Sequence, residues 1–206
     1  MPRQRRYHHG DLRRAVINAA VEVITTEGTV AISLRDLARR AGVSHAAPAH
    51  HFKDKAGLLT AIAIEGYEIL ADSMQEALAA TPIPLPEIGV RYVKFALEHP
   101  AHFEVMYRPE LYHRDDPELL AAKQWARRTL RAGIVTLPHG RRGEAAEFGV
   151  IAAWSLAHGF AVLARSGNLA EDLGEASPLS VFRRIAQRTI PAVDPVSEAD
   201  GSTTRP

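Results

Sequence analysis

Apolar residues recur with a helical period along most of the chain, and few stretches alternate in the way that a half-buried strand does. In the first periodic segment they fall three, four and seven residues apart, so they share one face of a helix. These positions are Leu12, Ala15, Val16, Ala19, Ala20, Val23 and Ile24. Gly28 follows them and is a typical residue after a helix end. The pattern predicts an all-α protein whose first helix covers residues 11–28.

Prolines, glycines and capping residues divide the remaining chain into eight further helices. Proline suits the first position of a helix, and we expect it there at Pro86, Pro117 and Pro178. Serine and aspartate side chains cap helix starts, and the candidates are Ser33 (with Asp36 completing a capping box), Ser44, Asp54, Asp116 and Ser177. The predicted helices cover residues 34–40, 45–52, 55–80, 86–98, 100–107, 117–135, 143–165 and 178–190.

The composition excludes several classes of protein. The 206 residues include no cysteine, which rules out disulfides, a cysteine nucleophile and thiolate metal sites. Residues 1–14 are charged where a secretory signal needs an apolar core, and no run approaches the ~20 apolar residues that span a bilayer. Residues 195–206 have little apolar content, so we expect them to be disordered. These features predict a soluble, cytoplasmic protein with no membrane partner.

Charge is distributed unevenly along the chain. Residues 1–55 carry ten Lys or Arg against five Asp or Glu, whereas the rest carries 15 basic and 19 acidic side chains. A basic segment of this kind attracts a polyanion, although it is often no more than a solvated surface. The asymmetry favours nucleic acid as the partner of residues 1–55.

Two of the predicted helices lie in this basic segment and are joined by Ala41-Gly42-Val43-Ser44. Glycine permits the positive φ that a tight turn requires, and Val43 fills the angle between the helices. The proportions are those of a helix-turn-helix, whose second helix enters the DNA major groove. The alternative is an ordinary corner between two helices.

The segment SLRDLARRAGVSHAAPAHHFKDKAGLL, residues 33–59, resembles the DNA-binding domain of the tetracycline-repressor (TetR) family of bacterial regulators. The matching residues are Ser33, Leu37, Ala38, Ala41-Gly42-Val43-Ser44, His51-Phe52, Lys55 and Leu58-Leu59. Farther along, Trp154-Ser155-Leu156-Ala157-His158-Gly159 is similar to the Trp…His-Gly signature of the WHG ligand-binding domain. Ala49 departs from the family pattern, because it stands where relatives have a tyrosine that contacts a DNA phosphate.

The resemblance implies a three-helix DNA-binding domain over residues 1–55 and a helical ligand-binding and dimerisation domain over residues 56–194. The helix at residues 143–165 and the last helix would form a four-helix bundle with the same pair of a second subunit. The implied protein is a homodimeric repressor, acting at the nucleoid, that binds a near-palindromic site on double-stranded DNA. It would leave this operator when a small apolar or amphipathic effector binds.

Phosphate contacts hold such a protein in register, and contacts to base edges specify the sequence. Polar groups at helix starts suit phosphate oxygens, N-terminal arginines add general attraction, and residues of the second helix face the bases. The residues predicted to contact DNA are Arg5, Arg6, Ser33, Arg35, Ser44, His45, Ala46, Ala49, His50, His51 and Lys55.

Aromatic residues on the later helices are expected to surround the effector. Trp154 and His158 are four residues apart and so share one helix face. The predicted cavity residues are Tyr92, Phe103, Tyr107, Trp125, Trp154 and His158. His102 is a further polar group that could orient a ligand there. The alternative is that these side chains only pack the core.

No enzymatic activity, metal or cofactor is expected. The sequence lacks the G-x-S-x-G, S-x-x-K and H-E-x-x-H motifs and any glycine-rich phosphate loop. Two other interpretations stay open at this point. One is an α-helical enzyme with an incidental basic segment, and the other is a DNA-bound interaction protein that needs no effector.

Overall fold

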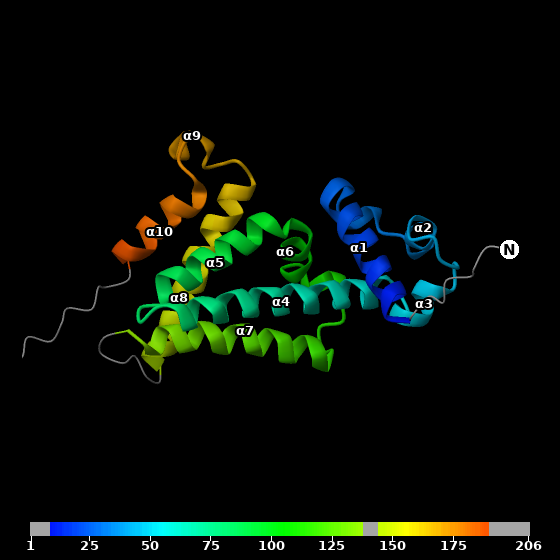
Figure 1. Cartoon of the computed structure of the whole chain (residues 1–206), viewed down its shortest axis with the longest axis horizontal. Coiled ribbons are helices and arrows are strands. Elements are labelled where there is room, and N and C mark those ends of the chain that lie inside the picture. The colour runs from blue at the N-terminus through cyan, green and yellow to red at the C-terminus, as the bar shows by residue number, and fades with distance from the viewer. Residues whose placement is uncertain (1–8, 138–143, 190–206) are drawn as a thin grey trace, which may run out of the picture.

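The computed structural model describes residues 9–137 and 144–189, and these residues form helices and connecting turns without a strand (Figure 1). The α-helices are α1 (His9–Glu27), α2 (Leu34–Arg40), α3 (Ala47–Phe52), α4 (Lys55–Ala80), α5 (Leu85–Glu98), α6 (Pro100–Met106), α7 (Pro117–Val135), α8 (Glu144–Arg165), α9 (Ala170–Leu173) and α10 (Pro178–Thr189). Two short 3₁₀ turns are η1 (Thr29–Ala31) and η2 (Pro109–Leu111). The all-α prediction is confirmed, and α9 is the one α-helix in these ranges that was not predicted.

Helix α4 links the two ends of the molecule (Figure 1). Helices α1 and α3 contact α4, and α2 contacts α1 and α3, while α5, α6 and α7 also pack against α4. Its 26 residues give it a length of about 39 Å at 1.5 Å per residue. Asp54 caps its start as predicted, because the carboxylate accepts a hydrogen bond from the Gly57 amide at 2.7 Å. One continuous helix therefore touches both groups of helices.

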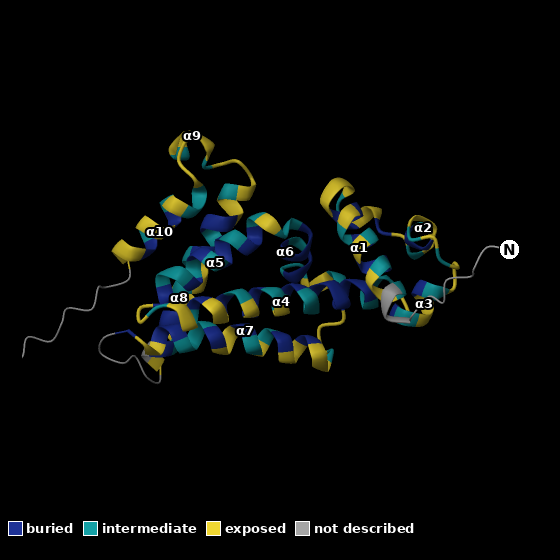
Figure 2. Cartoon of the chain, in the orientation of Figure 1, coloured by how far each residue is buried: buried dark blue, intermediate teal, exposed yellow. Residues whose placement is uncertain are grey.

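The main apolar core continues from α1 to α10, and buried positions line the inward faces of the helices (Figure 2). Ile17, Leu58, Met106 and Phe182 are among its most deeply buried members, and they come from four different helices. Each such side chain contributes roughly 1.5–3 kcal/mol to folding when it leaves water. A smaller cluster joins α5, α7 and α8 and contains Leu85, Ile134, Leu137, Ala146 and Val150.

The predicted caps of α2 and α3 are corrected by the structure. Ser33 holds the N-cap position of α2, but its side chain makes no capping hydrogen bond. Asp36 does not complete a capping box, because its carboxylate binds Arg39 and Arg40 one turn later. Ser44 does not cap α3, since the turn continues to Ala46 and the helix begins at Ala47.

The later helix starts agree better with the prediction. Helices α7 and α10 begin at Pro117 and Pro178, and the Asp116 carboxylate accepts two amide hydrogen bonds in the first turn of α7. Helix α5 begins one residue early, so Pro86 is its second residue and Pro84 is its N-cap. The predicted residues 143 and 190 and the segment 195–206 lie outside the described residues.

Candidate DNA interface and ligand cavity

Helices α2 and α3 and the turn between them form the predicted helix-turn-helix. Gly42 adopts a positive φ of 67°, and the Val43 amide donates a hydrogen bond to the Ala38 carbonyl at 3.0 Å. Val43 packs against the core. Pro48 and Phe52 bury one side of α3, so the other side faces solvent.

Most of the residues predicted to contact DNA are exposed, and they lie on α3, in the turn before it and at the start of α2. The exposed ones are Ser33, Arg35, Ser44, His45, Ala46, Ala49 and His50. His51 and Lys55 are half-buried, and the Lys55 ammonium donates to the Val30 carbonyl at 3.4 Å. Arg5 and Arg6 lie outside the described residues.

The basic residues of this region fall into two groups. Arg39 and Arg40 bind Asp36, and Arg14 binds Glu65 at 2.7 Å, so these charges are neutralised within the chain. Arg35 and Lys53 are exposed and form no ion pair with any described residue. Lys53, which directly follows α3, was not among the predicted contacts, although its place next to His51-Phe52 in the sequence is a usable signal.

A hydrogen-bonded aromatic cluster lies farther along the molecule, where α5, α6 and α8 meet. The Tyr92 hydroxyl is its centre: it donates to the Tyr107 hydroxyl at 2.6 Å and lies 2.8 Å from His158 Nδ1. The indole N–H of Trp154 donates to the same hydroxyl at 3.3 Å. The Phe103 ring stacks on the His158 ring with a centroid separation of 5.3 Å. Five of the six predicted cavity residues therefore form one connected group.

Burial sets the protonation state of this cluster. It raises the pKa of Tyr92 to about 12 and raises the pKa of Tyr107 still further. It also lowers the pKa of His158, so the imidazole is neutral at neutral pH. The cluster is thus a set of uncharged hydrogen-bonding groups, which can orient a ligand without requiring a counter-charge.

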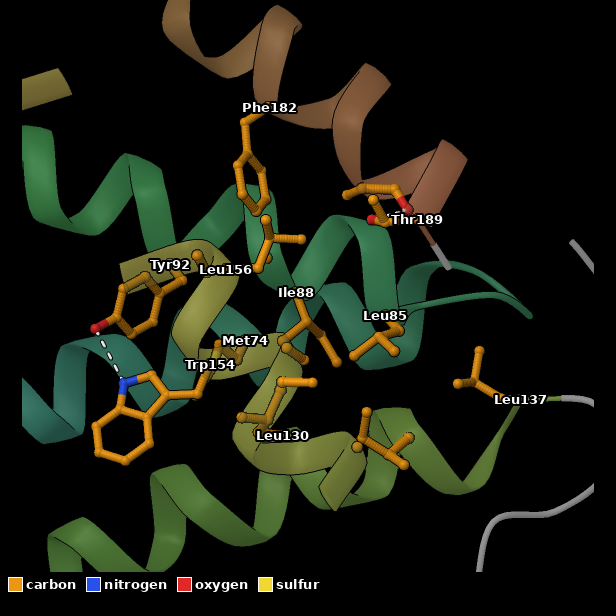
Figure 3. A pocket seen from close by; sticks show the side chains of 17 residues that line it. Met74, Leu85, Ile88, Tyr92, Leu130, Leu137, Trp154, Leu156, Phe182 and Thr189 are labelled. Atoms are coloured by element: carbon orange, nitrogen blue, oxygen red, sulfur yellow. Dashed lines mark hydrogen bonds between the residues drawn. The ribbon is translucent and has the colours of Figure 1, made fainter. Parts of the chain in front are cut away.

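Two adjoining cavities flank this cluster. The first, of about 310 Å³, lies among α4, α5, α7 and α8, with Tyr107 at its wall; it is lined by Tyr67, Leu70, Met74, Tyr92, Tyr107, Lys123, Ala126, Arg127, Leu130, Val150 and Trp154. The second, of about 160 Å³, extends toward α10 and is almost entirely apolar (Figure 3). Figure 3 shows Tyr92 and Trp154 at one end of it and Leu85 and Leu137 toward the other. The two cavities share Met74, Tyr92, Leu130 and Trp154.

Four of the residues predicted to contact a ligand line neither cavity, namely His102, Phe103, Trp125 and His158. Phe103 and His158 belong to the aromatic cluster beside the cavities. Trp125 packs on the core and lines neither of them. His102 is buried at the junction of α1, α4 and α6, where its Nε2 lies 3.6 Å from a Glu65 carboxylate oxygen. That separation is too long for a hydrogen bond, and neither ring nitrogen of His102 has a hydrogen-bond partner among the described residues.

Several cavity residues were not predicted, namely Tyr67, Met74, Lys123 and Leu130. The apolar ones cannot be told from ordinary core residues by their spacing. Lys123 is different, because it stands four residues after Leu119 and three before Ala126, both buried on α7. A charged residue within an apolar stripe is a signal that sequence reasoning could have used.

Helix α8 presents an unusually apolar surface. Five of its large apolar residues are exposed, and they are Phe148, Ile151, Trp154, Val162 and Leu163. By length and composition alone, the stretch 146–165 could also cross a membrane, a test that core helices of soluble proteins pass as well. Gly159 lies on the same helix, and apart from its own stretch of helix no atom of the described residues comes within 4 Å of the position that a Cβ would take there.

Comparison with known proteins gives two family matches. Residues 16–62 match the family described as bacterial regulatory proteins, tetR family, and residues 85–189 match the tetracyclin repressor-like C-terminal domain. The HTH-type transcriptional regulator BetI of Rhizobium meliloti is 34% identical over 101 residues, which cover 46% of this chain and 50% of that protein. The chain thus spans about half the length of the curated relatives that it matches.

Solved structures extend the likeness to nearly the whole chain. A protein of unknown function from Rhodococcus sp. RHA1 is 28% identical, with a TM-score of 0.75, over 90% of this chain and 96% of that chain. The TetR-like regulator LfrR from Mycobacterium smegmatis, solved in complex with proflavine, is 18% identical with a TM-score of 0.62. The match covers 88% of this chain and 97% of LfrR, and at this identity it shows the fold alone.

Proposed function

Because the chain belongs to the tetR family of bacterial regulatory proteins, we propose that it is a DNA-binding transcriptional regulator that acts as an effector-released repressor. The observation that carries the proposal is the joining of a helix-turn-helix to a ligand-sized cavity by the single helix α4. In this proposal residues 1–55 bind DNA at the nucleoid, and residues 56–194 bind the effector and form the dimer.

The exposed side of α3 would enter the major groove of double-stranded DNA. His45 and His50 can hydrogen-bond to purine edges, and the small Ala46 and Ala49 side chains permit close approach to thymine methyl groups. Arg35, Lys53 and Lys55 would contact phosphates, together with Ser33, Ser44, His51 and the N-terminal Arg5 and Arg6. Because Ala49 cannot donate the hydrogen bond of the tyrosine found in relatives, contacts to the DNA backbone would depend more on the basic side chains among these residues.

A second copy of the chain would cover the apolar surface of α8. Exposed apolar patches of this kind mark interaction sites in soluble proteins. The open space over Gly159 would admit a crossing helix at close range. Two recognition helices related by a two-fold axis then require a near-palindromic operator, with half-sites about 34–36 Å apart.

An effector in the cavities would act on DNA through α4. Tyr67, Leu70 and Met74 of α4 line the larger cavity, while the same helix begins beside α3. A ligand that displaces this helix would change the separation of the two recognition helices. The bound proflavine of the structurally similar LfrR supports a small-molecule effector for this fold.

A gel shift with DNA from around the protein's own gene, run at two salt concentrations, tests the proposal. A regulator should bind with a steep loss of affinity at higher salt, because several phosphate contacts release counterions. A control duplex of the same length and scrambled sequence should bind more weakly. Equal binding to both duplexes would contradict sequence-specific regulation, and no binding to either duplex would refute the proposed DNA-binding function.

A further inference from the structure

The larger cavity contains one cationic side chain that lacks an acidic partner. The Lys123 ammonium donates a hydrogen bond to the Tyr112 hydroxyl at 3.2 Å. It also lies 4.9 Å from the centre of the Tyr112 ring and 5.6 Å from that of Tyr67. No carboxylate among residues 9–137 and 144–189 forms an ion pair with it, whereas the neighbouring Arg127 pairs with Glu147 at 2.7 Å. Lys123 thus keeps a positive charge that only neutral groups offset.

The face of α7 around Lys123 strengthens this positive charge. Lys123, Arg127 and Arg131 are spaced four residues apart, so they follow one another on the same side of the helix. Arg127 and Arg131 share a single carboxylate, that of Glu147. Three cations therefore share one anion along this side of α7, and two of them, Lys123 and Arg127, line the cavity, so the potential there favours a negatively charged ligand.

The aromatic residues of the cavity would by themselves suit a cationic ligand, because ring faces attract cations. Here, however, Lys123 already occupies the ring faces of Tyr67 and Tyr112. A second cation in the same cavity would be repelled by the ammonium. An anion would instead bind the ammonium directly and could accept a further hydrogen bond from a cavity tyrosine.

The second cavity defines the other end of the ligand. It adjoins the first through Met74, Tyr92, Leu130 and Trp154, and its remaining lining is apolar apart from Thr189. Figure 3 shows the side chains of Ile88, Leu156 and Phe182 arranged around it. A ligand body that enters this space must be apolar, since it would find almost no hydrogen-bond partners.

We propose that the effector is an amphipathic organic anion, whose acidic group binds Lys123 and whose apolar body passes Trp154 into the second cavity. This inference rests on the proposed function, in which the cavities hold the effector. It narrows the ligand from any small apolar or amphipathic compound to one with a carboxylate or similar acidic head.

Direct binding of three probes of matched length tests the proposal: decanoate, decanol and decylammonium. The chain has two tryptophans, so a W125F background leaves Trp154 as the one reporter of cavity occupation by fluorescence. We expect decanoate to bind at least about tenfold more tightly than decanol, as a charge-assisted contact allows, and decylammonium to bind most weakly.

Substitution of the cation completes the test. Lys123→Met should remove the preference of decanoate over decanol, and Lys123→Arg should retain it. Lys94→Met is the matched control, because Lys94 is a half-buried lysine on α5 that lines neither cavity. Decanol binding as tightly as decanoate, or an unchanged preference in Lys123→Met, would overturn the proposal. If Lys123→Met does not fold, the comparison of the three probes on the wild-type protein and the Lys123→Arg variant still test the proposal.

The result is independent of DNA binding. If the wild-type protein binds its operator but shows no preference for decanoate over decanol, the anionic effector is refuted and the regulator stays in place. Absence of operator binding by the unliganded wild-type protein refutes the proposed function, whatever the probes do.

Discussion

At the scale of single residues, His50 and Lys55 should affect DNA binding in different ways. His50 is exposed on the outer side of α3, whereas Lys55 begins α4 and its ammonium rests near the Val30 carbonyl. His50→Ala should therefore change which bases are preferred. Lys55→Ala should weaken binding to all sequences alike and lower the salt slope by about one. A binding selection with both variants measures the base preferences. A uniform loss of affinity in both would indicate that His50 contacts the DNA backbone and not the bases.

Buried His102 should make the stability of the fold depend on pH. Burial lowers the pKa of His102, and Glu65 opposes this effect more weakly while Arg14 and His99 add to it. The unfolded chain, with an ordinary pKa of about 6.5, then binds the proton more readily than the fold does. The free energy of unfolding should fall as pH drops below about 6.5 toward the lower pKa of the folded state.

Denaturant unfolding of the His102→Leu variant across this range checks the assignment. Leucine removes both unpaired ring nitrogens, so the variant should be at least as stable as wild type at pH 7 and should lose less stability below pH 6.5. His45→Leu, at an exposed position on the turn before α3, serves as the control. An unchanged pH slope in His102→Leu would show that another group is responsible.

Residue identities alone located the aromatic cluster and three of the residues that line the larger cavity, Tyr92, Tyr107 and Trp154. Tyr92, Tyr107, Trp154 and His158 were predicted, yet nothing in their spacing indicates that one hydroxyl joins the other three. Trp125 lines neither cavity, and the sequence could not show this because helical periodicity indicates which residues share a face and not which helix that face meets. Lys123 was also not predicted, although its charge within the apolar stripe of α7 is a usable signal.

At the scale of elements, the corner between α3 and α4 sets the angle of the recognition helix. Lys53 takes a positive φ of 64°, and the Asp54 amide donates to the Phe52 carbonyl only two residues back, at 2.8 Å. A Cβ added at Gly57 would lie 2.0 Å from that same carbonyl oxygen. The corner therefore combines a strained residue with a close backbone approach.

Two substitutions at this corner should have opposite effects. Gly57→Ala forces backbone atoms apart and should destabilise the protein by about 1–3 kcal/mol. Lys53→Gly relieves the positive φ and should stabilise it by about 1 kcal/mol. Thermal unfolding of the two variants measures both. Equal stability of Gly57→Ala and wild type would mean that the corner is looser than these contacts indicate.

The sequence predicted the bounds of several helices closely, and it misplaced or missed two of the shortest ones. The bounds of α4 and α7 agree with the structure because an aspartate cap opens each of them. Helix α9 has four residues, too few for a periodic pattern, and tertiary contacts must hold a single turn in place. The start of α3 was misplaced since Ser44 has the chemistry of a cap without its position.

At the scale of the whole molecule, light scattering should find a dimer held by α8. Ile151→Glu places a charge on its exposed apolar surface and should yield monomers at micromolar concentration, because an unpaired charge is poorly tolerated in an interface. Ile83→Glu is the matched control, since Ile83 is 44% exposed against 50% for Ile151 but lies between α4 and α5. A wild-type monomer at this concentration would exclude the proposed dimer.

Effector and operator should oppose each other to the same extent. Coupling through α4 of ~1–3 kcal/mol corresponds to a 5–150-fold change in DNA affinity, and linkage requires the same factor on the effector. Calorimetry of an identified effector, with and without operator DNA, measures this factor. Equal effector affinity in both titrations would rule out the α4 mechanism.

Because of the position of Trp154, the response to the effector should depend on the concentration of the protein. Its indole lines both cavities and is also 41% exposed on the surface that a second subunit would cover. Subunit association would then complete a wall of the cavity, and the cavity of a separated subunit would be more open to solvent. The sensitivity of the switch to its signal would therefore rise with the copy number of the protein in the cell.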